Sequence, residues 1–309
     1  MVLEGLLLAA AAVIVTYNSA DVVLNCLEAL RKMAPGVTAV VVDNASSDAT
    51  TGRVAGRAEL IVNTENSGFS AAVNQGIRST GAEFVLLMNP DVNLLSPVDR
   101  LVEACRRSGI AAGKLVDPEG RPQAGFGIRR FPTALSLSFE MLGMNRIFPW
   151  NPVNRRYRYL DRSLDESGPV EQPAGAFLMI RRDVWEKLGG FDENFRPIWF
   201  EDVDFCKRAR DAGFAAEYVP EVVASHAGAH SIGQLPAGCR AWYWCVSLLK
   251  YAAKHFPVIG YRGVCAVMLL SSVPRMVAGI IRERSLSPVV VHSKIAKFAG
   301  LRLLFPGAE

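Results

Sequence analysis

Three carboxylates lie within four positions of the segment WFEDVDF, residues 199–205. Acidic side chains are costly to bury unless they are paired, hydrogen-bonded or bound to metal, and here aromatic residues flank them on both sides. Glu201, Asp202 and Asp204 could open a helix, where acids suit the N-terminal end of the helix dipole. They could instead form a reaction centre in which one of them acts as a general base.

Two further acids close apolar runs that are typical of buried strands. Asp43 ends VVVD and could contact the ribose or base of a nucleotide, or it could cap the following turn. Asp91 ends MNPD, where Pro90 stiffens the turn and a carboxylate could bind a hard divalent cation. An ordinary Asn-Pro-Asp turn is the alternative for Asp91.

His226 lies in SHAGAHS beside glycines that permit close backbone approach, so it could be a metal ligand, a diphosphate contact or a plain loop residue. The six cysteines form no CxxC pair, which argues against a zinc site and for a reducing compartment. The motifs GxGxxG, GxxxxGK[ST] and GxSxG do not occur where they would be needed. Dinucleotide dehydrogenases, P-loop NTPases and serine hydrolases are therefore disfavoured.

The elements that must position these residues alternate between strand and helix. This rhythm predicts a doubly wound parallel sheet, in which ligands bind beyond the carboxyl ends of the strands. The polar clusters at 16–18, 43–44, 63–68 and 89–91 all fall at such ends. The predicted strands are 11–16, 38–44, 60–63, 84–92 and 176–180, with strand material in AAEYVPEVVASHAG, and the predicted helices are 20–33, 69–80, 183–188 and one that WFEDVDF enters.

Two stretches give weaker signals. Residues 117–172 are rich in Pro, Gly, Arg and turn residues and allow no ordered assignment. The start, MVLEGLLLAAAAVIV, is apolar but is interrupted by Glu4 and has no basic region. We expect a short extension leading into the first strand, rather than a signal peptide or a membrane span.

The charge divides the chain, because residues 240–309 carry ten Lys or Arg against two Glu while residues 1–239 carry 24 basic and 28 acidic side chains. We expect a domain over 1–239 and a basic helical extension over 240–309. The run 263–281 is apolar but contains Pro274 and Arg275, so no uninterrupted stretch reaches the ~18 residues of a membrane span. The extension could lie on an anionic membrane surface or merely cap the domain. Its charges alternate with apolar runs, which disfavours a nucleic-acid partner.

Seven segments occur in one order: TYN, DNASSD, NSGFSAAVNQG, MNPD, GAFLMIRRDVWEKLGGFDENF, FEDVDFCKRARDAGF and VPEVVASHAGAHS. Together they resemble the family 2 glycosyltransferases of GT-A fold, particularly the bacterial rhamnosyltransferase-like branch, over residues 11–235. The resemblance implies an α/β fold with a mostly parallel, doubly wound sheet. It also implies an inverting transfer of L-rhamnose from dTDP-L-rhamnose, or of a hexose from a UDP-sugar, to an acceptor hydroxyl.

The resemblance assigns residues to the site by position. Asp202 would be the general base, with Glu201 and Asp204 in support. Asp91 would bind Mg²⁺ or Mn²⁺, with His226 as a second ligand because Asn89 cannot supply a carboxylate. The acceptor side would be lined by Gly175, Ala176, Trp199 and Phe200. The nucleotide sugar would contact Thr16, Tyr17, Asn18, Asp43, Asn44, Asn66, Gly68, Phe69, Asn74, Asn89 and Asp91.

The implied partners are a nucleotide-diphosphate sugar, a glycan or polyprenyl-diphosphate-linked acceptor, and an anionic membrane surface. The corresponding location is the cytoplasm, peripheral on the inner face of the cell membrane, in cell-surface polysaccharide or lipid-linked glycan assembly. A protein of another class remains open: a catalytically silent GT-A domain that binds nucleotide or glycan as a scaffold.

Overall fold

A computed structural model describes residues 9–228 and 230–305, which form two compact units. The first unit comprises the chain up to residue 131, 158–197 and 201–233, and the second comprises 132–157, 198–200 and the chain from 234 onward. Residues 132–157 thus group with the C-terminal helices. The expected N-terminal extension falls on residues 1–8, which lie outside the described residues.

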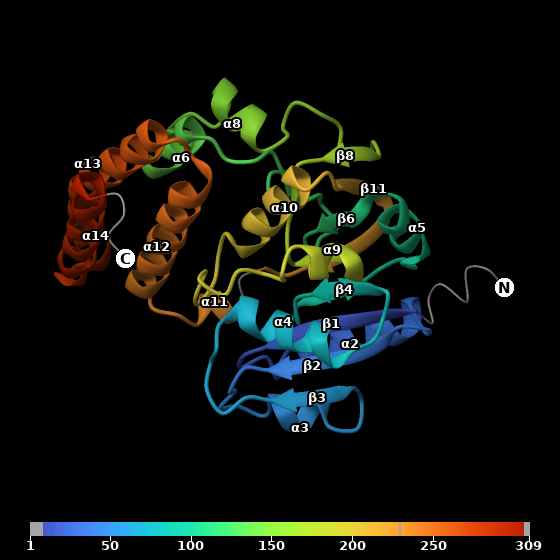
Figure 1. The fold of residues 1–309 in the computed structure, drawn as a ribbon. Coiled ribbons are helices and arrows are strands. Elements are labelled where there is room, and N and C mark those ends of the chain that lie inside the picture. Colours follow the sequence, from blue (N-terminus) through green and yellow to red (C-terminus); the bar gives the residue numbers. More distant parts are fainter. Residues whose placement is uncertain (1–8, 229, 306–309) are drawn as a thin grey trace. The chain divides into compact units, whose positions relative to one another are not determined.

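A nine-stranded mixed sheet organises the first unit, in the order β3-β2-β1-β4-β10-β6-β11-β5 with β8 beside β11 (Figure 1). Its first four strands are parallel, β10 runs antiparallel between β4 and β6, and β11 lies parallel to β6. β7 and β9 pair separately. The strands are β1 (Ala10–Thr16), β2 (Thr38–Asp43), β3 (Glu59–Val62), β4 (Phe84–Met88), β5 (Val92–Leu94), β6 (Gly109–Val116), β7 (Ile128–Arg129), β8 (Gly168–Val170), β9 (Gln172–Pro173), β10 (Phe177–Arg181) and β11 (Ala215–His226).

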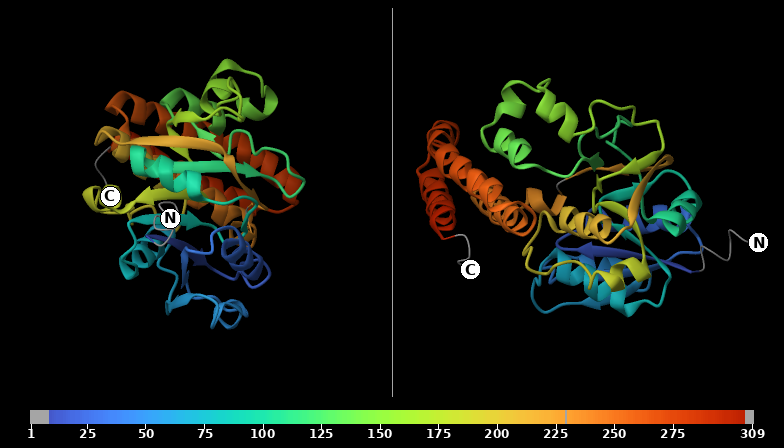
Figure 2. Two further views of the ribbon diagram at one scale, coloured as in Figure 1. Left: turned by 90° about the vertical axis from the view of Figure 1, so that its right-hand side faces the viewer. Right: turned by 45° about the horizontal axis from the view of Figure 1, so that its top comes forward.

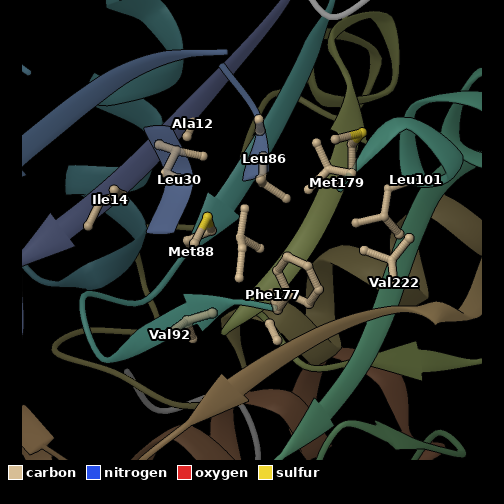
Figure 3. Close-up of a cluster of buried hydrophobic side chains, with 14 of the residues drawn as sticks. Ala12, Ile14, Leu30, Leu86, Met88, Val92, Leu101, Phe177, Met179 and Val222 are labelled. Carbon is tan, nitrogen blue, oxygen red and sulfur yellow. The ribbon is translucent and has the colours of Figure 1, made fainter. Parts of the chain in front are cut away.

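Helices cover both faces of this sheet, as the βαβ rhythm predicts. Alternate residues of β1 enter two cores: Ala12 and Ile14 pack with α2 and α5, and Val13 and Val15 pack with α4, α9 and α10. Figure 3 shows the first core, where Phe177 lies among side chains of several strands; Figure 2 gives two further views. The helices of this unit are α2 (Val23–Met33), α3 (Thr50–Val54), α4 (Phe69–Ser79), α5 (Asp99–Ser108), α9 (Arg182–Lys187), α10 (Glu201–Asp211) and α11 (His230–Gly233).

The predicted elements before residue 84 and after residue 176 are confirmed, with ends that differ by a few residues. One prediction is wrong: the strand expected over 84–92 stops at Met88. The Asn89-Pro90-Asp91 turn follows, and Val92 begins β5, which pairs with the end of β11 instead of continuing β4. Proline lacks the amide hydrogen that a central strand needs, which accounts for the break.

The second unit is helical, with α6 (Ala134–Met141), α7 (Met144–Ile147), α8 (Pro152–Tyr157), α12 (Ala237–His255), α13 (Val258–Glu283) and α14 (Ser287–Leu304). The helical pattern expected after residue 240 is confirmed. Pro274 does not end its helix, however, because α13 continues through it for nine more residues. Among the described residues, α13 is the one helix long and apolar enough to cross a membrane.

A substitution at Gly113 tests the packing of the sheet. A Cβ atom there would lie 2.4 Å from the Val222 carbonyl oxygen and 2.5 Å from Phe177 Cε1. We expect Gly113→Ala to lower the free energy of unfolding by about 1–3 kcal/mol through overpacking, measured by urea denaturation. Gly52→Ala is the control, since nothing lies within 4 Å of its Cβ position. Equal stability of the two variants would contradict this packing.

Candidate active site

The loops after β1 and β2 are joined through Asp43. Thr16 Oγ1 donates to Asp43 Oδ1 at 2.9 Å, and the Ser46 amide donates to Asp43 Oδ2 at 2.9 Å. Asp43 is fully buried. Asn18, in the left-handed region at φ 48°, accepts a hydrogen bond from the Ser47 amide. Asp43 therefore orders the loops around Tyr17 and Asn18, and its predicted nucleotide contact stays a prediction.

Asn44 closes the neighbouring loop. Its amide nitrogen donates to Asn66 Oδ1 at 2.9 Å, and its oxygen accepts from the Ser67 amide at 3.1 Å. Gly68 has φ 89°, a conformation that glycine adopts without strain, and leads into α4, where the Phe69 amide donates to the Pro197 carbonyl. The predicted residues Asn44, Asn66, Gly68 and Phe69 thus lie together at the carboxyl end of the sheet.

Asn74 has a different setting. Its side chain is buried and donates to the Phe191 carbonyl and to Glu193. Its oxygen accepts from the Phe191 amide and from Trp185 Nε1. Because these four bonds use its full capacity, the geometry favours a structural role, and the predicted donor contact has no direct support in this arrangement.

The Asn89-Pro90-Asp91 turn connects β4 to β5. The Asn89 amide donates to the Ala176 carbonyl at 3.0 Å, which ties the turn to the start of β10. Asp91 is buried, and its Oδ2 accepts from the Gly228 amide at 3.0 Å. Pairing of Val92 with His226 in the β5–β11 ladder brings His226 beside Asp91, with Nε2 3.6 Å from Oδ1.

The protonation of His226 follows from Gln123. The Gln123 amide nitrogen donates to the His226 carbonyl at 2.8 Å, so its oxygen faces Nδ1 at 3.0 Å. An amide oxygen only accepts, so Nδ1 carries the ring proton and Nε2 of the neutral ring presents a lone pair. Burial lowers the pKa of His226, against the opposing charge of Asp91, and favours the neutral ring.

Two acceptors, His226 Nε2 and Asp91 Oδ1, therefore face each other. A cation between them would remove this mismatch, and a second hydrogen bond that fixes the ring, as from Gln123, is usual for metal-binding histidines. Carboxylate oxygen suits Mg²⁺ and Mn²⁺, and imidazole nitrogen is a ligand for first-row divalent metals. The pair fits a divalent cation as a partial site, because no group of three His, Cys, Asp or Glu side chains comes together within the described ranges.

Asp202 lies at the start of α10, half-buried. Its Oδ2 accepts from the Gly175 amide at 2.9 Å and its Oδ1 from the Val203 amide at 2.8 Å. Gln172 Nε2 lies 3.4 Å from Oδ2. Burial raises the pKa of Asp202, and the hydrogen bonds from Gly175 and Val203 offset this only in part. Gly175 leaves little room for a side chain here, since a Cβ atom would lie 3.0 Å from Asp202 Cβ, which is a tight contact.

The two neighbouring acids have other surroundings. Asp204 is fully buried and accepts from Arg208 Nε at 2.7 Å, while Arg208 also donates to the Leu188 and Gly190 carbonyls. The Asp204–Arg208 pair therefore fixes α10 against the preceding segment. Glu201 is buried at the first residue of α10. Their predicted supporting roles in catalysis stay predictions, and the helix-start explanation accounts for their position.

Trp199 and Phe200 group with the second unit. Phe200 is buried there and its ring lies 5.5 Å from that of Tyr251. Both residues have positive φ, 77° and 68°, which is strained for bulky side chains and occurs often at functional sites. Their predicted acceptor contacts are not tested by this geometry.

Four residues of the site come from the stretch that sequence patterns left unassigned. Gln123 fixes His226, and Phe126 stacks on the His226 ring at 5.0 Å. Arg129 pairs in register with Gln172 in the β7–β9 ladder, and its charge lowers the pKa of Asp202 against the larger effect of burial. Two-residue strands carry no periodicity, so only the polar residues among turn formers could have drawn attention to this stretch.

Comparison with known proteins decides the family. Residues 11–189, more than half of the chain, match the family described as Glycosyl transferase family 2. The chain belongs to the family 2 glycosyltransferases. Like other members, it is a glycosyl-transferring protein, and the family assignment made from the seven sequence segments is confirmed.

Relatives of this glycosyltransferase include rhamnosyltransferases. It is 29% identical over 239 residues to the N-acetylglucosaminyl-diphospho-decaprenol L-rhamnosyltransferase of Mycobacterium tuberculosis, covering 71% of this chain and 76% of that protein. It is 26% identical over 191 residues to rhamnosyltransferase WbbL of Escherichia coli, covering 60% and 67%. The fold resembles the mannosyltransferase PcManGT of Pyrobaculum calidifontis, solved with GDP-Man and Mn²⁺, at TM-score 0.52 and 14% identity, over 97% of this chain and 88% of that one. The predicted GT-A fold is confirmed.

Paired substitutions on α10 separate the two aspartates. Asp204→Asn should lower the free energy of unfolding by about 3 kcal/mol at neutral pH, because Arg208 loses its buried counter-charge. Asp202→Asn should leave it unchanged or raise it, because burial disfavours the charged carboxylate that asparagine replaces.

The raised pKa of Asp202 also predicts how its effect on stability changes with pH. A carboxyl whose folded pKa is raised binds more protons folded than unfolded, so its cost to stability is present at neutral pH and disappears as pH falls through the raised value. The stability of the unsubstituted protein relative to Asp202→Asn should therefore increase on acidification. Urea unfolding at a series of pH values measures the stability changes and their pH dependence. A strongly destabilised Asp202→Asn would contradict the inference that burial disfavours the charged carboxylate.

Proposed function

We propose that this protein is an inverting glycosyltransferase that moves L-rhamnose from dTDP-L-rhamnose to an acceptor hydroxyl, with a hexose from a UDP-sugar as the alternative donor. The observation that carries the proposal is the setting of Asp202, a half-buried carboxylate of raised pKa held by the Gly175 amide. Ala176, which follows Gly175 in the sequence, accepts a hydrogen bond through its carbonyl from the turn that carries Asp91. The proposed base and the candidate cation site are thus both hydrogen-bonded to the same backbone segment, residues 175–176.

In this mechanism Asp202 accepts the proton of the acceptor hydroxyl while that oxygen attacks the anomeric carbon from the face opposite the nucleotide. A raised pKa makes the carboxylate a better proton acceptor near neutral pH. Gly175 and Val203 fix the carboxylate through their amides, and Gln172 approaches the oxygen that Gly175 holds. Inversion needs no nucleophilic carboxylate, which agrees with the commitment of Asp204 to Arg208.

Asp91 and His226 would hold a divalent cation, Mg²⁺ or Mn²⁺. When bound, such an ion neutralises the negative charge of a diphosphate leaving group. Gln123 keeps the His226 lone pair directed at Asp91, and Phe126 covers the ring. Thr16, Asp43 and Asn44 hold the loops at the carboxyl ends of β1 and β2, the edge where nucleotides bind in doubly wound sheets.

The names of the relatives support the choice of substrates. The M. tuberculosis relative is named for rhamnosyl transfer to a diphospho-decaprenol-linked acceptor. We extend this to a polyprenyl-diphosphate-linked glycan as the acceptor here, in cell-surface polysaccharide assembly. The enzyme would then work in the cytoplasm, peripheral on the inner face of the cell membrane, where such a lipid presents its headgroup.

The base is tested by Asp202→Asn. We expect sugar transfer from dTDP-L-rhamnose to fall by about 10²–10⁴-fold, because the acceptor hydroxyl loses its proton acceptor. Thermal stabilisation by dTDP should persist. Asp211→Asn, an exposed change on the same helix, is the control and should transfer normally. Unchanged transfer by Asp202→Asn would remove Asp202 from this role; no transfer and no nucleotide-dependent stabilisation by the unsubstituted protein would favour a scaffold.

The cation is tested by binding rather than turnover. Asp91→Asn and His226→Gln should each weaken Mn²⁺ binding in the presence of dTDP by at least about tenfold, measured from the free Mn²⁺ signal in electron paramagnetic resonance. Asp165→Asn, a surface change in the same unit, should bind as before. Equal Mn²⁺ affinity in all three variants would show that the cation does not bind at Asp91 and His226.

A further inference from the structure

The α13 helix of the second unit has its side chains distributed in an unusual way. Leu270, Val273, Val277 and Ile281 recur at the three- and four-residue spacing of one helix face and are 54–74% exposed. We call these four residues the outer strip. No charged residue interrupts that face between them.

Alongside the outer strip, the residues of α13 that are covered by protein include polar ones. Ser271 and Ser272 are buried, and their hydroxyl groups donate hydrogen bonds to the Met268 carbonyl. Arg275 donates to the Met141 carbonyl at 2.8 Å, at the end of α6. Gly279 allows α14 to approach, since a Cβ there would lie 2.5 Å from Pro288 Cβ. A helix on a water-exposed surface turns its apolar residues inward, whereas α13 leaves the four apolar residues of the outer strip exposed.

Exposed apolar residues are concentrated in the same unit. Of the twenty large apolar side chains that are exposed among the described residues, seventeen belong to the second unit. They include Leu286 and Val290, which directly follow the strip around the turn into α14. Soluble surfaces rarely expose so much contiguous apolar area without a partner.

Charge identifies the partner. The residue ranges of the second unit contain thirteen Lys or Arg and three Glu. A cavity of about 1170 Å³ within the unit borders α13 beside the strip, at Pro274 and Ala278. Its lining includes four cationic side chains, Arg146, Arg275, Arg282 and Lys294, and two carboxylates. Cations beside an apolar strip match the phosphates and acyl chains of an anionic bilayer.

We propose that the outer strip of α13 docks on an anionic lipid bilayer, with the adjacent basic cavity receiving lipid phosphates. The strip from Leu270 to Ile281 is about 16 Å long, shorter than the ~30 Å hydrocarbon core, and the other face of α13 is packed on α6 and α14. The helix therefore lies in the membrane interface rather than crossing it. The role of this docking rests on the proposed function, because a lipid-linked acceptor would lie in that interface.

The test uses full-length protein and sedimentation with vesicles of phosphatidylcholine alone or mixed with phosphatidylglycerol. The unsubstituted protein should bind the mixed vesicles, and added salt should weaken binding. Leu270→Glu combined with Val277→Glu should lower the vesicle partition coefficient by at least about tenfold, because two apolar side chains no longer enter the lipid. Ala253→Glu combined with Ser293→Glu is the matched control, with the same change of charge at exposed positions off the strip.

Three results would overturn the proposal: binding by the strip variant at the level of the control, equal binding to both vesicle types, or a dimer in solution that the strip variant dissociates while vesicles bind neither protein. Thermal stabilisation by dTDP and UDP is measured alongside on every variant. If dTDP and UDP do not stabilise the unsubstituted protein but vesicles still bind it, the proposed sugar transfer fails and the docking surface stands. If nucleotides stabilise it but vesicles do not bind, the docking surface fails and the proposed transfer stands.

Discussion

The hydrogen bond from the Gly175 amide to the Asp202 carboxylate is the contact on which the rest of the site depends. It joins the start of α10 to the segment leading into β10, and Gly175 permits it because any side chain there would meet Asp202. One residue later, the Ala176 carbonyl accepts from Asn89 and holds the turn that carries Asp91. Insertion of β10 antiparallel between β4 and β6 thus sets the proposed base and the candidate cation site on a single stretch of backbone.

Three aspartates of the site acquire different properties from their surroundings alone. Burial raises the pKa of Asp202 despite two amide hydrogen bonds. Asp204, two residues further along, is committed to Arg208 in the core. Asp91 faces the lone pair of a neutral His226. Proton transfer and cation binding require opposite tendencies of a carboxylate, and the different environments of Asp202 and Asp91 are consistent with the two roles proposed for them.

Sequence patterns predicted the parallel half of the sheet because β1, β2 and β4 are continuous apolar runs. They also placed the candidate site at the strand ends, because ligands gather there in such sheets. They could not assign partners. Asn74 meets Phe191, 117 positions away, and nothing local to Asn74 specifies that contact. The same holds for Gln123 and Gln172, which lie near strands too short to carry periodicity. Pro274 interrupts the apolar run of 263–281 in the sequence, yet α13 continues through it, because packing against α6 and α14 outweighs the local preference.

The two units differ in net charge far more than the net charge of the whole chain suggests. The net charge of +4 combines thirteen Lys or Arg against three Glu in the residue ranges of the second unit with 21 basic against 27 acidic side chains elsewhere. A nucleotide diphosphate that approached the first unit would meet a net negative body. The cation proposed at Asp91 and His226, with Arg129 near Asp202, would therefore matter more there than in a basic domain. An anionic surface would attract the second unit and repel the first, so the charge of the helical unit favours the same partner as the docking proposed for the outer strip of α13.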